Sequence, residues 1–205
     1  SRGLSKWTIT RRDRVNAGRY AAKVRSMIIE IRNYLAASHL LNTEPSKWTA
    51  IVILDSQCNA TDFVANHTTA HLLLRFDDIT TPRYGKRMVD SRALQSALDF
   101  AADQEQLIVS CRAGQSRSAA VAHAICFQNN GATTANQILN PRRHYPNRHV
   151  IETVAPLLDD PTYLTTFDEW AREHANIKIL DYFDEIKAEF DEWEAQGARN
   201  LIVTP

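Results

Sequence analysis

A seven-residue segment from Cys111 to Arg117 contains the residue types that chemistry on a phosphate ester requires. It reads Cys-Arg-Ala-Gly-Gln-Ser-Arg, with a thiol at one end and a guanidinium at the other. A cysteine thiolate is a nucleophile, and a planar guanidinium can bind two phosphate oxygens through parallel hydrogen bonds. We therefore interpret the segment as a phosphate-binding loop that carries its own nucleophile.

The Cys-x5-Arg spacing alone has little weight in a chain rich in arginine, so its surroundings decide the interpretation. Gly114 stands in the middle of the loop, where it allows close backbone approach, and Ser116 and Ser118 flank the arginine. The apolar triplet 107–109 predicts a buried strand before the loop, and the alanine-rich run 118–127 predicts a helix after it. A turn from strand to helix directs backbone N–H groups and a helix N-terminus at one point, which attracts an anion and favours thiolate over thiol.

These residues predict a mechanism with a covalent intermediate. Cys111 would attack phosphorus to form a phosphocysteine, while Arg117 and the loop N–H groups stabilise the charged oxygens. Ser118 would donate a hydrogen bond to the sulfur and help it leave in the second step. The residues expected to hold the phosphate are Arg112, Ala113, Gly114, Gln115, Ser116 and Arg117. A thiolate mechanism needs no metal ion, and no cofactor is expected.

The leaving oxygen of the ester needs a proton, which a carboxylic acid on a neighbouring loop can supply. Asp77 and Asp78 both qualify, because they follow the segment 71–76, which predicts a strand. The alternative for either residue is an exposed turn position or a salt bridge to Arg75 or Arg83.

One stretch of the chain resembles the active-site loop of the protein tyrosine phosphatase superfamily, in its dual-specificity-like branch: Val109-Ser110-Cys111-Arg112-Ala113-Gly114-Gln115-Ser116-Arg117-Ser118. The segment 71–79 is similar to the strand and turn that carry the family's general acid, and 143–147 is similar to its Arg and Pro-Asn segment. The resemblance covers about residues 50–157 and suggests a small bacterial-type member. In the family the acid lies just past the strand end, a place that Asp78 matches better than Asp77.

The loop departs from the family at Ser110, where a histidine usually precedes the nucleophile and helps to arrange the loop. Because the loop N–H groups and Arg117 remain, the reaction is still expected. A phosphate-binding pseudophosphatase is the alternative that this departure supports.

The resemblance implies a phosphatase that hydrolyses phosphomonoesters of phosphoproteins or phosphopeptides. Phosphotyrosine is the expected substrate, together with phosphoserine and phosphothreonine if the enzyme has dual specificity. The loop is also expected to bind phosphate-like oxyanions. A phosphoinositide or small-molecule phosphatase is the alternative, ranked lower because Arg112 is the only additional cation in the loop.

Strands and helices are expected to alternate along the chain, which is typical of an α/β fold with a central, mostly parallel sheet flanked by helices. Further strands are predicted at 49–54 and 71–76. Helices are predicted at 12–41, at 91–102 with Asp90 or Ser91 as its cap, at 133–139, and after Asn147, which caps the last of them. We interpret 1–205 as a single domain with three parts: an N-terminal helical extension (1–45), a phosphatase core (46–158) and an acidic C-terminal helical extension (159–205).

Charge is balanced overall but uneven along the chain. Residues 1–32 carry nine basic and two acidic groups, whereas residues 152–197 carry thirteen acidic and three basic groups. Solvated helix faces that lie near each other in the fold explain this pattern most simply, and a basic arm for an anionic partner is the alternative. The zero net charge argues against a nucleic-acid binder, and no apolar run approaches a membrane span. Three cysteines, an odd number, fit a reducing compartment, so a cytoplasmic location without membrane partners is expected.

Two further features of the sequence have open interpretations. Arg142, Arg143 and His144 would either line the rim of the pocket or form salt bridges and helix-end contacts. In the C-terminal part, a narrow apolar stripe runs along an otherwise acidic helix: Ile179, Phe183, Ile186, Phe190 and Trp193. It is expected either to pack against the core or a basic N-terminal helix, or to pair with a second chain.

Overall fold

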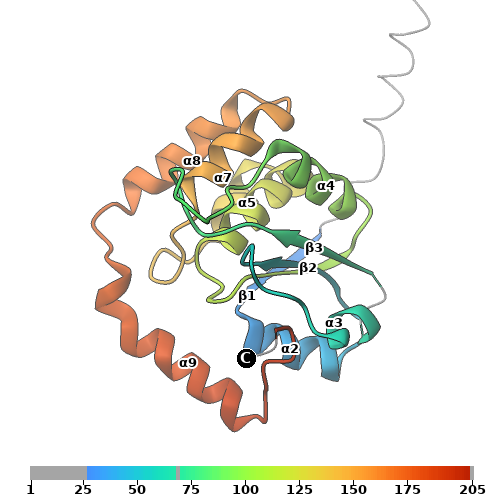
Figure 1. The fold of residues 1–205 in the computed structure, drawn as a ribbon. Coiled ribbons are helices and arrows are strands. Elements are labelled where there is room, and N and C mark those ends of the chain that lie inside the picture. The colour runs from blue at the N-terminus through green and yellow to red at the C-terminus, as the bar shows by residue number, and fades with distance from the viewer. Residues whose placement is uncertain (1–26, 68–69, 204–205) are drawn as a thin grey trace, which may run out of the picture.

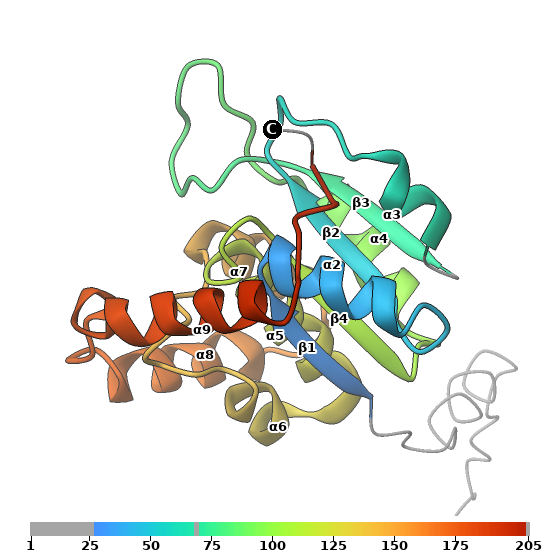
Figure 2. The ribbon, with the colours of Figure 1, turned by 90° about the horizontal axis from the view of Figure 1, so that it is seen from below.

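The computed structural model describes residues 27–67 and 70–203, in which a parallel sheet lies between two layers of helices (Figures 1 and 2). Every neighbouring pair of strands is parallel, and the spatial order is β1-β4-β2-β3. The strands are β1 (Ile28–Arg32), β2 (Thr49–Leu54), β3 (His71–Arg75) and β4 (Gln106–Ser110). The α/β prediction is therefore confirmed, and the sheet formed by these strands is wholly parallel.

The two central strands are apolar on both faces, as a sheet covered by helices on both sides requires. In β2, Ile51 and Ile53 belong to one apolar cluster, whereas Val52 and Leu54 belong to the other. The strands predicted at 49–54, 71–76 and 107–109 are confirmed. The prediction succeeded because a short apolar run is typical of a buried strand.

Helices cover the sheet on both sides (Figures 1 and 2). The apolar cluster on one face includes residues of α4, α5, α7 and α8, and the cluster on the other face includes residues of α2 and α3. The bounds are α2 (Tyr34–Thr43), α3 (Asp62–His67), α4 (Ser91–Ala101), α5 (Arg117–Asn130), α6 (Ala132–Gln137), α7 (Arg148–Val154), α8 (Thr162–Glu173) and α9 (Phe183–Ala195). Two helix caps predicted from sequence are confirmed: Asp90 accepts from the Ala93 N–H (2.8 Å) and Asn147 from the Val150 N–H (3.1 Å).

The prediction of one helix over residues 12–41 is confirmed for residues 34–41, which belong to α2, and is wrong for residues 28–32. Residues 28–32 form β1, which pairs along its whole length with β4. The chain turns at Asn33, whose side chain accepts from the Ala36 N–H (2.8 Å) and caps α2. The apolar spacing suited a helix, but pairing with a strand nearly 80 residues later decided the structure. Residues 12–26 lie outside the described residues, and the proposed division into three parts stays a prediction.

The C-terminal segment folds back onto α2. Trp193 of α9 contacts the ring of His39 with centroids 5.5 Å apart, so the stripe is covered in part by this chain. Beyond α9, Ile202 is fully buried among apolar residues from α2 and β2, and its carbonyl accepts from the Thr61 N–H (2.8 Å). No residue of α9 itself is fully buried, and Phe183 is 60% exposed.

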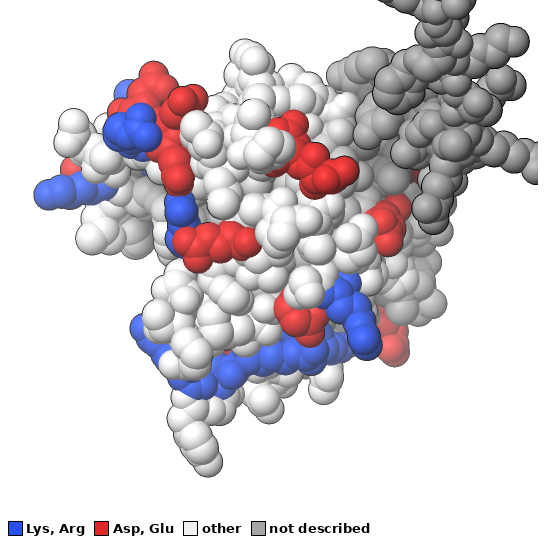
Figure 3. Space-filling view, turned by 90° about the horizontal axis from the view of Figure 1, so that it is seen from above, with Lys and Arg blue, Asp and Glu red and all other residues white. Residues whose placement is uncertain are grey.

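Charged side chains are mixed on the surface drawn in Figure 3. Basic side chains form a band along one edge of this face, and acidic side chains lie beside the band and elsewhere on the face. Most of the basic N-terminal residues lie outside the described part of the chain, so whether they pair with the acidic helices stays a prediction. None of the described helices has the length and apolar character that a membrane span requires.

The buried contact of Ile202 predicts that the last residues stabilise the fold. Ile202→Ala should lower the free energy of unfolding by about 2–5 kcal/mol, because it removes a buried side chain and leaves a cavity. Phe183→Ala is the matched control and should change it by no more than about 0.5 kcal/mol, since this side chain is largely exposed. Urea unfolding measures both. Equal losses of the free energy of unfolding in the two variants would mean that residues 198–203 do not pack as described.

Candidate active site

The loop between β4 and α5 places Cys111 in the lining of a cavity. Cys111 follows the last residue of β4 and is only 2% exposed. Its Sγ lies 3.1 Å from the Oγ of Ser118, which is in the first turn of α5 and fully buried. The sulfur therefore has a hydroxyl within hydrogen-bond distance, at the residue that the sequence singled out for this contact.

Gly114 fixes the position of the loop against β1. It has φ +70°, and a Cβ there would lie 2.6 Å from the backbone N of Asn33 and 2.7 Å from the backbone C of Arg32. Neither backbone atom can move without shifting the end of β1. Glycine is thus needed both for its conformation and for its lack of a side chain.

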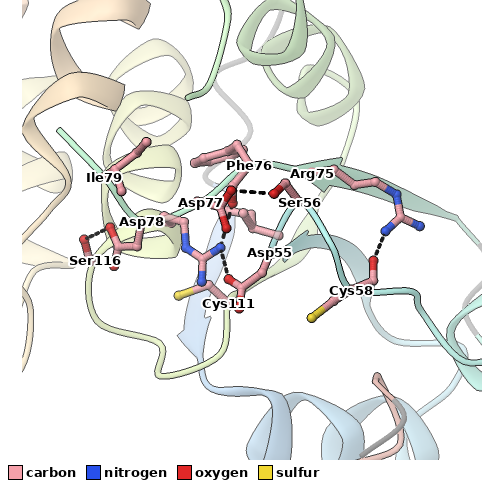
Figure 4. A network of polar contacts seen from close by, with 12 residues as sticks. Asp55, Ser56, Cys58, Arg75, Phe76, Asp77, Asp78, Ile79, Cys111 and Ser116 are labelled. Atoms are coloured by element: carbon pink, nitrogen blue, oxygen red, sulfur yellow. Dashed lines mark hydrogen bonds and ion pairs between the residues drawn. The ribbon is translucent and has the colours of Figure 1, made fainter. Parts of the chain in front are cut away.

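Arg117 is buried and already held from one side. Its Nη1 donates to the Phe76 carbonyl (2.7 Å) and pairs with the Asp55 carboxylate (2.6 Å). These two partner residues are labelled in Figure 4. Burial lowers the pKa of Arg117, but Cys111 and Asp55 outweigh burial and raise it, so the guanidinium remains charged. Its Nε is buried without a partner among the described residues, so it is free to donate to a bound anion.

Asp78 lies at the cavity and is held by two donors. Its Oδ1 accepts from Ser116 Oγ (2.7 Å) and from Asn147 Nδ2 (2.7 Å). Asn147 also donates to the Ile79 carbonyl (3.3 Å), which fixes the turn that follows β3. Asn147 thus both caps α7 and positions Asp78, a second role that sequence reasoning missed.

Asp77 is buried and has its own set of hydrogen-bond donors. It accepts hydrogen bonds from the Ser56 hydroxyl, the Arg87 N–H (2.8 Å) and Lys86 Nζ (3.2 Å). Desolvation raises its pKa, but these donors outweigh desolvation and lower the pKa to about 2. A carboxyl held ionised in this way is poorly suited to donate a proton near neutral pH.

The cavity has a volume of about 360 Å³ and brings the expected groups together. Its lining contains these residues predicted from sequence: Asp78, Cys111, Arg112, Ala113, Gln115, Ser116 and Arg117. Gly114 and Ser118 lie behind this lining, where one supports the loop and the other contacts the sulfur. Arg142, Arg143 and His144 are not part of the lining.

Sequence reasoning missed Asp55, Lys86 and Tyr145, which also line the cavity. Asp55 directly follows β2, and the carboxyl ends of parallel strands meet at one edge of a sheet, where ligands bind. That position was a usable signal. Tyr145 lies in the segment 143–147, whose resemblance to the family was noted, but nothing in the sequence marked its side chain as part of the cavity, because the Tyr145 N–H reaches the Gln115 carbonyl (3.1 Å) only through the fold.

Comparison with known proteins found no matching family model and no matching curated protein. Solved structures similar in fold include Tk-PTP in its active form (14% identity, 73% of this chain, 95% of that chain, TM-score 0.39). PTPMT1 in complex with PI(5)P is 16% identical over 75% of this chain and 95% of that chain, with a TM-score of 0.36. The Yvh1 phosphatase domain from Chaetomium thermophilum is 14% identical over 69% and 87%, with a TM-score of 0.33.

The third of these structures is described as a phosphatase domain, and the first two carry the names Tk-PTP and PTPMT1. Their TM-scores lie below 0.4, so the likeness is distant. The chemistry of the site therefore has to be argued from its own residues.

The packing of Gly114 predicts a sharp difference between two glycine variants. Gly114→Ala should weaken binding of inorganic phosphate about tenfold or more, because the new Cβ would push the loop off β1. Gly85→Ala is the control: its φ is +71°, but nothing lies within 4 Å, so only backbone strain of about 1 kcal/mol is expected. Calorimetric titration and thermal unfolding separate the two effects. Similar phosphate affinities in both variants would contradict the role given to Gly114.

Proposed function

We propose that this protein is a phosphatase that hydrolyses phosphomonoesters through a phosphocysteine on Cys111. The observation that carries the proposal is the arrangement around one cavity of a buried thiol, a buried guanidinium and a carboxyl group. The guanidinium keeps its Nε available, and Asp78 lies on the same cavity. Nucleophile, anion-binding group and proton donor are the three components that this reaction requires.

In the first step the Cys111 thiolate attacks phosphorus as the bond from phosphorus to the leaving oxygen breaks. Arg117 and the loop N–H groups stabilise the charge on the phosphoryl oxygens. Asp78 gives its proton to the leaving oxygen, so that an alcohol or phenol departs. Ser116 and Asn147 orient Asp78 for this transfer, because both donate to its Oδ1.

In the second step a water molecule attacks the phosphocysteine. Asp78, now ionised, accepts a proton from that water, and the bond from phosphorus to sulfur breaks. The Ser118 hydroxyl, 3.1 Å from the sulfur, stabilises the departing thiolate with a hydrogen bond. Inorganic phosphate is released, and the thiolate and the protonated Asp78 are regenerated.

Phosphotyrosine in proteins or peptides is the substrate that we propose first, with phosphoserine and phosphothreonine as further substrates of a dual-specificity enzyme. Tyr145 is 54% exposed at the cavity wall and provides an aromatic surface beside the loop. A second candidate is a phosphoinositide or another polyanionic small phosphate, because Arg83, Lys86 and Arg112 also line the cavity. A phosphate-release screen over phosphopeptides, inositol lipids and nucleotides distinguishes these substrates.

The role of the loop predicts distinct outcomes for two substitutions. Cys111→Ser should abolish turnover but retain phosphate binding, because the hydroxyl is a poor nucleophile while the loop survives. Arg117→Lys should lose turnover and also phosphate binding at this loop, since an ammonium cannot replace the planar fork and would not reproduce the pairing with Asp55. Phosphate release and phosphate titration measure the two properties. Turnover by Cys111→Ser at the wild-type rate would refute the proposal.

The two carboxylates predict different responses to amidation. Asp78→Asn should slow esters with poor leaving groups by about a hundredfold or more, and esters with good leaving groups far less, because only the former need the proton. Asp77→Asn should lower stability by removing a carboxylate that accepts three hydrogen bonds, but keep the wild-type dependence on the leaving group. Rates for a series of aryl phosphates test this, and the opposite pattern would exchange the two roles.

A further inference from the structure

A second polar cavity, the rear cavity, lies behind the Cys111 loop. It has a volume of about 230 Å³ and is lined by Ile29, Glu30, Ile31, Arg32, Ile138, Asn140, Arg143 and His144. It shares no lining residue with the cavity at Cys111. The backbone of Arg32 separates the two, because it contacts Gly114 on one side while the residue also lines the rear cavity.

Four buried nitrogens around the rear cavity have no hydrogen-bond partner among the described residues. They are Arg32 Nε, Arg143 Nε, Arg143 Nη2 and His144 Nε2. Each guanidinium does have one carboxylate partner, but through other nitrogens: Arg32 Nη2 pairs with Glu30 (2.5 Å) and Arg143 Nη1 pairs with Glu189. The remaining edge of Arg143, formed by Nε and Nη2, is the edge that binds an oxyanion with two parallel bonds.

All four of these nitrogens are donors. His144 is 6% exposed, and its Nδ1 accepts from the Asn140 N–H (3.0 Å), so the proton of the neutral ring is on Nε2. Burial and the charges of Arg143 and Arg32 lower the pKa of His144 to about 3, which keeps the ring neutral. A site with several unpaired donors requires a ligand that accepts several hydrogen bonds.

The two guanidiniums at the rear cavity repel each other, although each is paired with one carboxylate. Burial, followed by repulsion from Arg32, lowers the pKa of Arg143 to about 10. Glu30 in the lining pairs with Arg32, and Glu189 pairs with Arg143 from outside the lining, so each guanidinium has its carboxylate on one side only. An anion between the guanidiniums would relieve this repulsion, whereas bridging water would fill hydrogen bonds without adding charge.

We propose that the rear cavity is a second oxyanion site, which binds a phosphate-type anion through Arg32, Arg143 and His144. A tetrahedral anion matches the donor set better than a carboxylate, because it offers oxygens to three separate residues. The site does not depend on the phosphatase reaction. Because Gly114 packs directly on the backbone of Arg32, an anion bound here holds the residue on which the Cys111 loop rests. The site is thus placed to couple anion binding to the order of that loop.

Titration of the full chain with inorganic phosphate, followed by NMR of the arginine Nε–H resonances, tests the proposal. Wild type should show two binding events, one that shifts Arg117 and another that shifts Arg32 and Arg143. Arg117→Met should remove only the first event. Arg143→Lys should weaken only the second, by about tenfold or more, because lysine keeps the charge but lacks the Nε and Nη2 pair.

Arg142→Lys is the matched control, because Arg142 is exposed, pairs with Glu185 and stacks over the ring of Tyr182 outside the rear cavity. It should retain both events. If Arg143→Lys does not fold, Arg32→Lys should weaken the second event instead. The proposal is overturned if Arg32 and Arg143 do not shift in the wild type, or if the second event survives both substitutions unchanged. A chain that fails to hydrolyse phosphate esters but retains the second event would contradict only the proposed function.

Discussion

The burial of the positive charge on Arg117 is the constraint on which the site depends. A buried cation without partners would be costly. The carboxylate of Asp55 and the Phe76 carbonyl, at the ends of β2 and β3, stabilise this cation through Nη1. Since the protein partners use one nitrogen, the guanidinium is held in place and still has donors for an anion. The same contacts that stabilise the charge therefore also orient it.

Parallel strand pairing explains why these groups meet. Asp55 follows β2, Asp77 and Asp78 come shortly after β3, and Cys111 follows β4, so all of them lie at the carboxyl edge of one sheet. Figure 4 shows Asp55, Asp78 and Cys111 gathered in one small region, whereas Cys58 and Arg75 lie to one side. The two adjacent aspartates have different environments. Asp77 is hydrogen-bonded to Ser56 and Lys86, whereas Asp78 is hydrogen-bonded to the loop through Ser116.

The edge strand β1 gives the site its support. Its last residue, Arg32, lies beneath Gly114 and also lines the rear cavity. On the other side, the segment around Tyr145 and Asn147 is tied to the loop by backbone bonds to Gln115 (3.1 Å) and Ser116 (3.2 Å). The loop is thus held between two segments that are far from it in sequence. Its geometry depends on the whole fold and not on its seven residues alone.

Local signals in the sequence were sufficient to predict much of the fold and of the candidate site. Apolar runs identified β2, β3 and β4, and the side chains of Asp90 and Asn147 marked helix starts, because burial patterns and caps act within a few residues. The residue types from Cys111 to Ser118 were sufficient to predict an anion-binding loop with a nucleophile, although its catalytic role stays a proposal.

Residues 28–32 were mistaken for helix, since their spacing fits both structures and only pairing with β4 selects the strand. Tertiary structure likewise brought Asp55 to Arg117, gave Asp77 and Asp78 different partners, and placed Arg143 and His144 in the lining of the rear cavity. Each of these outcomes depends on contacts between segments distant in the chain, where burial and charge compensation, not local preference, determine which groups meet.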